Sequence, residues 1–154
     1  MRFFYRVLAI MNQFSPSDAD ETRQLGFDIG ALLLPGDLIT LSGPLGAGKT
    51  TFAQGLARGL GIAEEITSPT FVLMSEYEGE TPLLHMDAYR LENAQYDELR
   101  DAGWEDFLGR EDAVRLLEWP EMVEKWLPTP RFRIRFEIVG DGEKQARWVE
   151  ISEG

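Results

Sequence analysis

The residues best suited to chemistry lie together in one short stretch, GPLGAGKTT at 43–51. The spacing G-x-x-x-x-G-K-T, from Gly43 to Thr50, matches the phosphate-binding P-loop pattern in full. Glycine suits such a loop because backbone N–H groups must wrap around a phosphate chain, and a Cβ atom would obstruct both the wrapping and the turn. The stretch therefore predicts a site for the phosphates of a nucleotide.

Three polar residues at the end of this stretch have distinct expected contacts. The Lys49 side chain should reach the β and γ phosphates, and the Thr50 hydroxyl should be a ligand of Mg²⁺. Thr51, one residue further, can donate a hydrogen bond to the α phosphate. A helix that begins near Lys49 would add its positive dipole end and its unpaired N–H groups to the same site.

This chemistry needs a buried strand before the loop and a helix after it, and the sequence predicts both. Residues 38–42, LITLS, form a short apolar run between turn signals, as a buried strand does. From Lys49 to about Leu60, apolar residues recur at helical spacing on one face. Gly55 and Gly59 interrupt that helix, and either they are tolerated there or they allow close packing on a sheet.

The other predicted elements surround this strand and helix. A helix within 15–37 should begin with a capping box, because Asp18 and Glu21 have the required spacing. The remaining elements follow from apolar periodicity and from Gly and Pro positions. They are a hairpin of 70–77 and 82–89, two short helices within 92–112 with a turn near Gly103, a strand at 113–119, a short helix between Pro120 and Pro128, and a hairpin over 131–152.

The order of these elements predicts a three-layer α/β domain of the P-loop NTPase-like type. Its sheet should be mixed, because the two hairpins add antiparallel strands. A chain of 154 residues fits one domain with one core, so we assign 1–154 to a single domain. In this prediction residues 1–12 are an optional N-terminal extension, since Met11 offers an alternative start.

Composition and charge exclude several classes of protein. The chain has no cysteine and a single histidine, His85, which rules out disulfides, thiolate nucleophiles and histidine metal clusters. No apolar run approaches the roughly 20 residues that span a bilayer, so we expect no membrane association. A formal charge of −12 is unlike the basic footprint of a nucleic-acid-binding protein. These features fit a cytoplasmic protein.

A P-loop also needs an acid that completes the Mg²⁺ ligand shell. Such an acid usually stands at the end of an apolar strand beside the P-loop strand. Two acids have this placement in the sequence: Glu118 follows AVRLL, and Asp87 follows PLLHM. The pattern alone does not choose between them.

Three functional classes are compatible with the loop at this stage. They are an ATPase, a small-molecule kinase, and a nucleotide-dependent binding module with negligible turnover. The guanine-reading Asn-Lys-x-Asp loop of GTPases is absent, because neither Asn12 nor Asn93 precedes a lysine. A kinase needs a lid with phosphate-binding arginines, and the arginines within 90–112 are diluted by acids, which weakens that alternative.

Four motifs together resemble the bacterial TsaE family, in the family's order and spacing. They are GPLGAGKTTFAQGLARGLG at 43–61, TSPTFVLMSEYEG at 67–79, LLHMDAYRLE at 83–92 and LLEWPE at 116–121. The similarity extends from about residue 17 to the C-terminus. The resemblance implies a small Mg²⁺-dependent ATPase that is required for the threonylcarbamoyladenosine modification of tRNA at position 37.

The resemblance also implies which residues hold the nucleotide and the metal. The ATP phosphates would be bound by Gly43, Gly46, Ala47, Gly48, Lys49, Thr50 and Thr51. It favours Glu118 over Asp87 as the acid that binds Mg²⁺ together with Thr50. Asp87 and Thr70 are then the expected catalytic residues, with Thr70 near the γ-phosphate as a switch-like threonine.

The resemblance further implies protein partners. TsaD and TsaB would form a complex with this chain, and tRNA would be contacted only indirectly through that complex. The residues expected to act as switches or to face partners are Ser68, Tyr89, Arg90 and Trp119. A role as core filler is an equal alternative for Trp119, and for His85 we expect a structural role.

Overall fold

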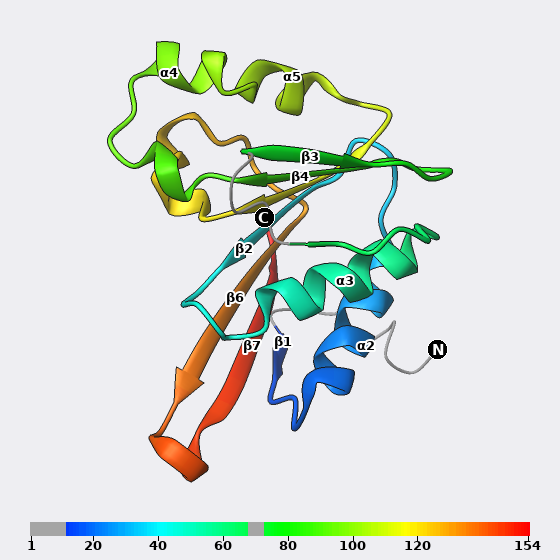
Figure 1. Ribbon diagram of the computed structural model, residues 1–154, viewed down its shortest axis with the longest axis vertical. Coiled ribbons are helices and arrows are strands. Elements are labelled where there is room, and N and C mark those ends of the chain that lie inside the picture. Colours follow the sequence, from blue (N-terminus) through cyan, green and yellow to red (C-terminus); the bar gives the residue numbers. More distant parts are fainter. Residues whose placement is uncertain (1–11, 68–72) are drawn as a thin grey trace.

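The computed structural model describes residues 12–67 and 73–154, and its centre is one seven-stranded sheet (Figure 1). In sheet order the strands are β1 (Asn12–Phe14), β7 (Ala146–Glu153), β6 (Phe132–Val139), β2 (Leu38–Ser42), β5 (Val114–Glu118), β4 (Leu83–Asp87) and β3 (Met74–Tyr77). The central strands β6, β2, β5 and β4 run parallel. The flanking strands β7, β1 and β3 are antiparallel to their neighbours.

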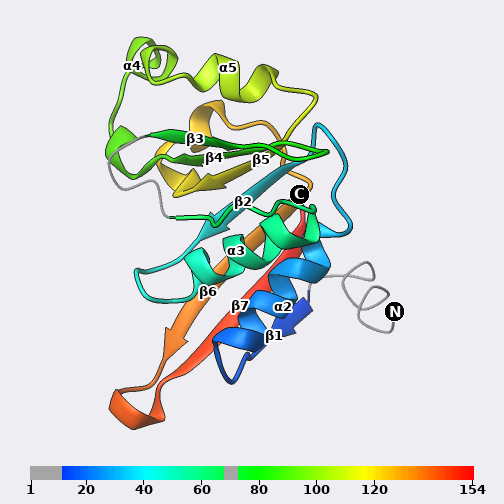
Figure 2. The ribbon, with the colours of Figure 1, turned by 45° about the vertical axis from the view of Figure 1, so that its right-hand side comes forward.

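Helices cover both faces of the sheet, which gives three layers. On one face lie α2 (Ala19–Gly30) and α3 (Lys49–Gly59), and on the other lie α4 (Tyr96–Asp101) and α5 (Trp104–Gly109) (Figures 1 and 2). Each face has its own apolar cluster: Ile39 and Leu41 of β2 belong to the first, and Leu38 belongs to the second. The prediction of a three-layer P-loop NTPase-like α/β domain with a mixed sheet is confirmed.

The helices α2 and α3 pack against each other through glycines. A Cβ atom on Gly55 would lie 1.9 Å from the Arg23 carbonyl oxygen, and one on Gly59 would lie 2.3 Å from the Phe27 carbonyl oxygen. Of the two alternatives, close packing is the one that the structure supports, but the packing is against α2 and not against the sheet. They face the neighbouring helix, because α3 uses its larger apolar residues, such as Phe52, to cover the strands.

The structure confirms the predicted cap of α2, the turn at Gly103 and the two hairpins. The Asp18 side chain caps α2 by accepting a hydrogen bond from the Glu21 N–H at 2.8 Å. The turn between α4 and α5 is at Gly103, which has a φ of 95°. Both hairpins form, one from β3 and β4 and the other from β6 and β7.

The predicted short helix between Pro120 and Pro128 does not form. Two 3₁₀ turns, η2 (Pro120–Met122) and η3 (Glu124–Trp126), take its place. They meet at Val123, whose φ of −128° is not helical and whose side chain is fully buried in the second cluster. Burial of this β-branched side chain fixes a backbone conformation that interrupts the helix. Two further 3₁₀ turns are η1 (Tyr89–Leu91) and η4 (Gly142–Lys144).

The described part of the chain begins inside the sheet. Asn12 in β1 pairs with Ile151 in β7, so this residue belongs to the sheet and not to an extension. Residues 1–11 lie outside the described ranges, and their role as an optional extension stays a prediction. Within 12–67 and 73–154, no helix is long and apolar enough to cross a membrane.

Candidate functional site

The glycine-rich loop connects the end of β2 to the start of α3, as the sequence predicts. Gly43 has a φ of 136°, and a Cβ atom there would lie 2.6 Å from the Phe136 carbonyl oxygen, so no larger residue fits. Gly48, with a φ of 108°, is the N-cap of α3 and offers no side-chain acceptor. The first N–H groups of α3 therefore have no capping side chain, which is the arrangement that binds phosphate at helix N-termini.

A cavity of about 210 Å³ lies beside this loop and brings most of the predicted residues together. It is lined by Leu45, Gly46, Gly48, Lys49, Thr50, Thr51, Asp87, Glu118 and Trp119. Gly43 and Ala47 do not line it: Gly43 lies where β2 ends, and Ala47 is buried in the first apolar cluster. Ser68 and Thr70 lie outside the described residues.

Sheet geometry explains why the two acids share this cavity. β4 and β5 are adjacent and parallel, and in their register Asp87 is the partner of Glu118. Successive side chains of a strand alternate between faces, so His85, Asp87 and Glu118 point toward the face that α3 covers. Glu118 is on the strand next to β2, which is the placement expected of the metal-binding acid, whereas Asp87 is one strand further away.

Lys49 has a buried ammonium group with no hydrogen-bond acceptor in the described structure. Only 6% of the residue is exposed, and its Nζ lies 4.2 Å from the centre of the Trp119 ring. Burial lowers the pKa of Lys49, although the nearby Glu118 and Asp87 carboxylates oppose the shift. A buried cation without an acceptor costs free energy, so this position is suited to an anion from outside the chain.

Glu118 has one partner of its own, which the sequence did not indicate. The carboxylate is buried, and its Oε2 atom lies 2.8 Å from His85 Nε2. This contact leaves Oε1 available to another ligand. The structural role expected of His85 is therefore to fix the position of the Glu118 carboxylate through this hydrogen bond. The alternation of side chains along β4 and β5 places His85 and Glu118 on the same face of the sheet. The sequence alone does not give the register that brings the two residues together.

Asp87 differs from Glu118 in its environment. Its Oδ1 accepts a hydrogen bond from the Tyr89 N–H at 2.9 Å. Burial raises the pKa of Asp87 from its ordinary value, and the Glu118 carboxylate adds to the effect, whereas the Tyr89 hydrogen bond opposes it. The carboxyl group of Asp87 thus holds its proton more strongly than an exposed aspartate does.

Of the predicted partner-facing residues that the structure describes, Trp119 lines the cavity and Tyr89 packs against Trp119. Tyr89, which is 56% exposed, contacts Trp119 with ring centres 5.0 Å apart. Trp119 has a φ of 59°, which is rare for an aromatic residue, and it packs both on Lys49 and on the second apolar cluster. Trp119 thus contributes to the packing of the core, and its role as a switch or partner-facing residue stays a prediction. Arg90, in η1, is exposed.

The donor set fits Mg²⁺ bound together with a nucleotide. Among the described residues no three His, Cys, Asp or Glu side chains form a cluster that could hold a metal by themselves. Mg²⁺ commonly takes one or two carboxylates and completes its shell with water and substrate phosphates. Glu118 and Thr50 line one cavity beside a loop suited to phosphate, so they are the residues that could supply such a partial shell.

A parallel core with a glycine-rich loop between β2 and α3 places the chain among P-loop NTPase-like domains. Within that class the chain belongs to a known family. The family described as "Threonylcarbamoyl adenosine biosynthesis protein TsaE" matches residues 16–147. This finding confirms the resemblance inferred from the four sequence motifs.

Individual relatives agree with the family match. The chain is 41% identical over 133 residues to the tRNA threonylcarbamoyladenosine biosynthesis protein TsaE of Bacillus subtilis, covering 86% of this chain and 81% of that protein. The TsaE protein of Treponema pallidum is 42% identical over 127 residues, or 82% of this chain and 92% of that protein. The crystal structure of Bacillus subtilis YdiB superimposes with a TM-score of 0.66 at 34% identity, covering 94% of this chain and 86% of that chain.

Proposed function

We propose that this protein binds ATP together with Mg²⁺ and hydrolyses it, in support of threonylcarbamoyladenosine formation at position 37 of tRNA. The observation that carries the nucleotide assignment is Lys49, a buried cation without an acceptor beside a glycine-rich helix start. The β and γ phosphates of a nucleotide would supply the missing acceptors. The pathway comes from the printed names of the family and of its relatives.

Each residue of the cavity has a part in the proposed reaction. The backbone N–H groups of residues 46–51 surround the phosphates, and Lys49 contacts the β and γ phosphates. Thr50 and the free oxygen of Glu118 hold Mg²⁺, while His85 fixes the orientation of Glu118. When bound, Mg²⁺ offsets the negative charge that develops on the phosphate oxygens during transfer.

Asp87 is the proposed group that orients the water attacking the γ-phosphate. It faces the same cavity as Lys49 but lies one strand further from the loop than Glu118 does. Thr70 is proposed to lie near the γ-phosphate on the strength of the family resemblance. In such a site catalysis comes mainly from positioning and charge stabilisation.

We propose that TsaD and TsaB are the protein partners, that tRNA is reached only through them, and that the protein acts in the cytoplasm. A chain with a formal charge of −12 is poorly suited to neutralise tRNA phosphates by itself. The docking residues are proposed to be Ser68, Tyr89, Arg90 and Trp119. Segments beside a γ-phosphate commonly order when it binds and relax after hydrolysis, which couples the site to a partner.

Steady-state phosphate release tests this proposal. We expect slow Mg²⁺-dependent hydrolysis by the protein alone, loss of activity when EDTA removes Mg²⁺, and stimulation when a TsaD–TsaB complex is added. Arg90→Ala should keep the affinity for Mg²⁺-ATP but lose most of the stimulation, whereas Arg100→Ala, another exposed arginine, should behave as the wild type.

Several outcomes would contradict the proposal. Rapid turnover without partners, or submicromolar binding of tRNA by the isolated chain at physiological salt, would argue against an indirect role. Transfer of labelled phosphate to a metabolite would identify a kinase instead. Absence of hydrolysis in a single-turnover experiment, with Mg²⁺-ATP bound, would identify a binding module.

A further inference from the structure

A groove of about 490 Å³ lies between β3, at one edge of the sheet, and α5. Of the described residues, none lines both this groove and the cavity of about 210 Å³ that contains Lys49. Figures 1 and 2 show α5 beside β3, on the face of the sheet opposite α2 and α3. The groove is lined by Met74, Glu76, Leu84, Glu105, Asp106, Gly109 and Arg110.

β3 is the last strand at its edge of the described sheet, and some of its backbone groups are unpaired. The Asp87 N–H donates to the Leu73 carbonyl oxygen at 2.9 Å, so these two residues form a hydrogen-bonded pair. Such pairs alternate along antiparallel strands, which turns the N–H and C=O groups of Met74 and Glu76 away from β4. In the described part of the chain these groups have no backbone partner. An edge of this kind is a template for another extended strand.

The groove also has a net negative charge. Arg110 donates to Glu76 at 2.7 Å, so these two charges offset each other. Glu105 and Asp106 are exposed on α5, next to the groove, and no ion pair of theirs is present within the described ranges. The surrounding segment, 92–112, has eight acids and two arginines, a formal charge of −6 out of −12 for the whole chain. The groove is therefore complementary to a cationic ligand.

We propose that this groove docks an extended basic segment of a partner protein, which joins the sheet as a further strand beside β3. The backbone of the segment would pair with the outward groups of Met74 and Glu76. Every second side chain of the segment would then enter the groove. A lysine or arginine there lays its apolar stem along Met74 and places its charged head beside Glu105 and Asp106.

A second copy of this chain does not suit the same edge. Pairing of one β3 with another would bring two acidic grooves together, and juxtaposed like charges oppose association. A basic segment meets no such opposition.

The inference does not depend on nucleotide binding, because the groove and the nucleotide cavity have separate walls. The two sites are nevertheless joined by one strand, β4. Leu84 of this strand lines the groove, and Asp87 at its end lines the cavity. A segment bound along β3 would therefore lie beside the pair of strands that positions Asp87.

The test uses a short synthetic peptide of alternating lysine and threonine, blocked at both ends, and the full chain. A peptide with glutamate in place of each lysine is the control for charge. Two further peptides carry N-methyl groups, one on the lysine nitrogens and the other on the threonine nitrogens, so that each loses the N–H donors of one edge. NMR shifts and amide hydrogen exchange locate the bound peptide, and calorimetry gives its dissociation constant.

We expect the lysine peptide to cause the largest slowing of amide exchange at Met74 and Glu76. It should bind at least about tenfold more tightly than the glutamate peptide. One of the N-methylated peptides should lose binding, and which one does so tells whether the added strand is parallel or antiparallel. Equal binding of the lysine and glutamate peptides would overturn the proposal, as would retained binding of both N-methylated peptides or no binding at millimolar concentration.

Two variants of the protein test the walls of the groove. Gly109→Leu should weaken binding of the lysine peptide about tenfold by filling the groove, since a Cβ atom there meets no atom within 4 Å and causes no clash. Asp106→Asn should weaken it about three- to tenfold, the size of one charged contact. Asp101→Asn, at an exposed acid of α4 outside the groove, has the same net charge and should bind as the wild type. Equal losses in Asp106→Asn and Asp101→Asn would overturn the proposal, because the attraction would then be general.

Met74→Pro tests the strand edge itself. It removes one outward N–H and leaves the hydrogen bonds between β3 and β4 in place, which is the position where an edge strand tolerates proline. With circular dichroism showing a folded protein, this variant should lose most of the binding. A homodimer of the wild type that Met74→Pro dissociates would overturn the proposal, because a second copy would then be the occupant of the edge.

Discussion

The two ends of the parallel strands differ in how their charged side chains are paired. At the N-terminal ends of β2 and β5, Asp37 accepts hydrogen bonds from Arg131 and from the Leu34 N–H, both at 2.7 Å. Arg115, at the same end, donates through its two terminal NH₂ groups to the Gly36 and Leu108 carbonyl oxygens, although its Nε has no acceptor in the described structure. At the C-terminal ends, Lys49 has no acceptor in the described structure and Asp87 has a raised pKa.

This difference indicates that charged residues at one end of the sheet stabilise the fold, whereas those at the other end bind a ligand. Charges that are paired inside the protein stabilise the fold and leave little to offer a ligand. Charges that are buried without partners reduce the free energy of unfolding, so they are retained where an outside group completes them. The comparison predicts that substitutions at the C-terminal end affect binding or turnover, whereas substitutions at the N-terminal end affect only stability.

The largest effect is expected for Lys49→Met. The affinity for Mg²⁺-ATP should fall on the order of 100-fold or more, because contacts to a charged phosphate are worth about 1.5–3 kcal/mol each. The free energy of unfolding without nucleotide should stay the same or rise, since methionine replaces a buried cation without an acceptor. Calorimetry and urea unfolding measure the two quantities.

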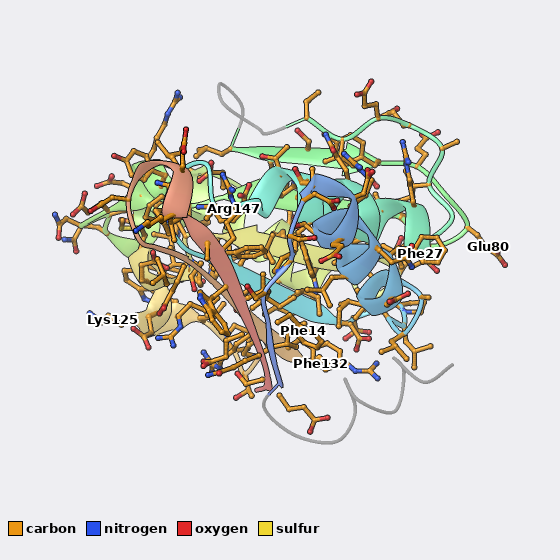
Figure 3. The ribbon with its side chains drawn as sticks, turned by 90° about the horizontal axis from the view of Figure 1, so that it is seen from below. Phe14, Phe27, Glu80, Lys125, Phe132 and Arg147 are labelled. Atoms are coloured by element: carbon orange, nitrogen blue, oxygen red, sulfur yellow. The ribbon has the colours of Figure 1, made fainter. Side chains whose placement is uncertain are left out.

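Lys125→Met is the matched control, because Lys125 also lies over a tryptophan ring, at 5.4 Å from that of Trp126, but is exposed (Figure 3). It should change neither quantity. If Lys49→Met clearly lowered the free energy of unfolding and kept the nucleotide affinity, Lys49 would serve stability and not binding, which contradicts the comparison.

Arg115→Met should produce the next largest effect, and it should affect stability. The variant leaves two backbone carbonyl oxygens, those of Gly36 and Leu108, without this donor. We expect a loss of about 1–2 kcal/mol in the free energy of unfolding, because these carbonyl oxygens are only partly buried, with unchanged affinity for Mg²⁺-ATP. Arg100→Met removes an exposed arginine and should cost less than about 0.5 kcal/mol.

The loop and its flanking elements could be predicted because their signals are local. The G-x-x-x-x-G-K-T spacing, the apolar run at 38–42 and the capping pair of Asp18 and Glu21 each depend on a few neighbouring residues. The two acids are likewise predicted from their positions at strand ends. That they lie close together depends on the register that pairs Asp87 with Glu118, and this register is a property of the folded sheet.

Contacts between distant segments could not be predicted in this way. Arg147 and Gly46 are 101 positions apart, and nothing near either residue indicates the hydrogen bond between them. Gly55 and Gly59 indicate close packing, but the sequence does not say against which element. That they pack against α2 depends on how the two helices are placed on the sheet. Val123 interrupts the helix predicted after Pro120 because its side chain is buried in the tertiary structure.

Asp87→Asn should have a smaller effect on stability, and one that depends on pH. Since burial raises the pKa of Asp87 above its ordinary value of 3.8, the folded protein favours the protonated carboxyl. That stabilisation is fully present below pH 3.8 and is lost as pH rises through the raised pKa. The nucleotide-free variant should thus be more stable than the wild type at neutral pH, and the difference should vanish in acid.

Urea unfolding across a pH series measures this difference, and Asp97→Asn, at an exposed acid of α4, is the control. In the presence of Mg²⁺-ATP, Asp87→Asn should keep its affinity and lose turnover, as expected of a residue that orients water. If Asp87→Asn instead lost affinity for Mg²⁺, Asp87 and not Glu118 would be the acid that binds the metal.

The smallest effect is expected for the ion pair at the N-terminal end of β2. The Arg131 side chain is 33% exposed and that of Asp37 is 18% exposed, so solvent screens their attraction. A double-mutant cycle of Asp37→Ala and Arg131→Ala should give a coupling of about 0.5–1 kcal/mol. Asp37→Ala alone should cost more than Arg131→Ala, because it also removes the acceptor of the Leu34 N–H. All three variants should bind Mg²⁺-ATP as the wild type does, and a change in that affinity at unchanged stability would show that the two ends of the sheet are not independent.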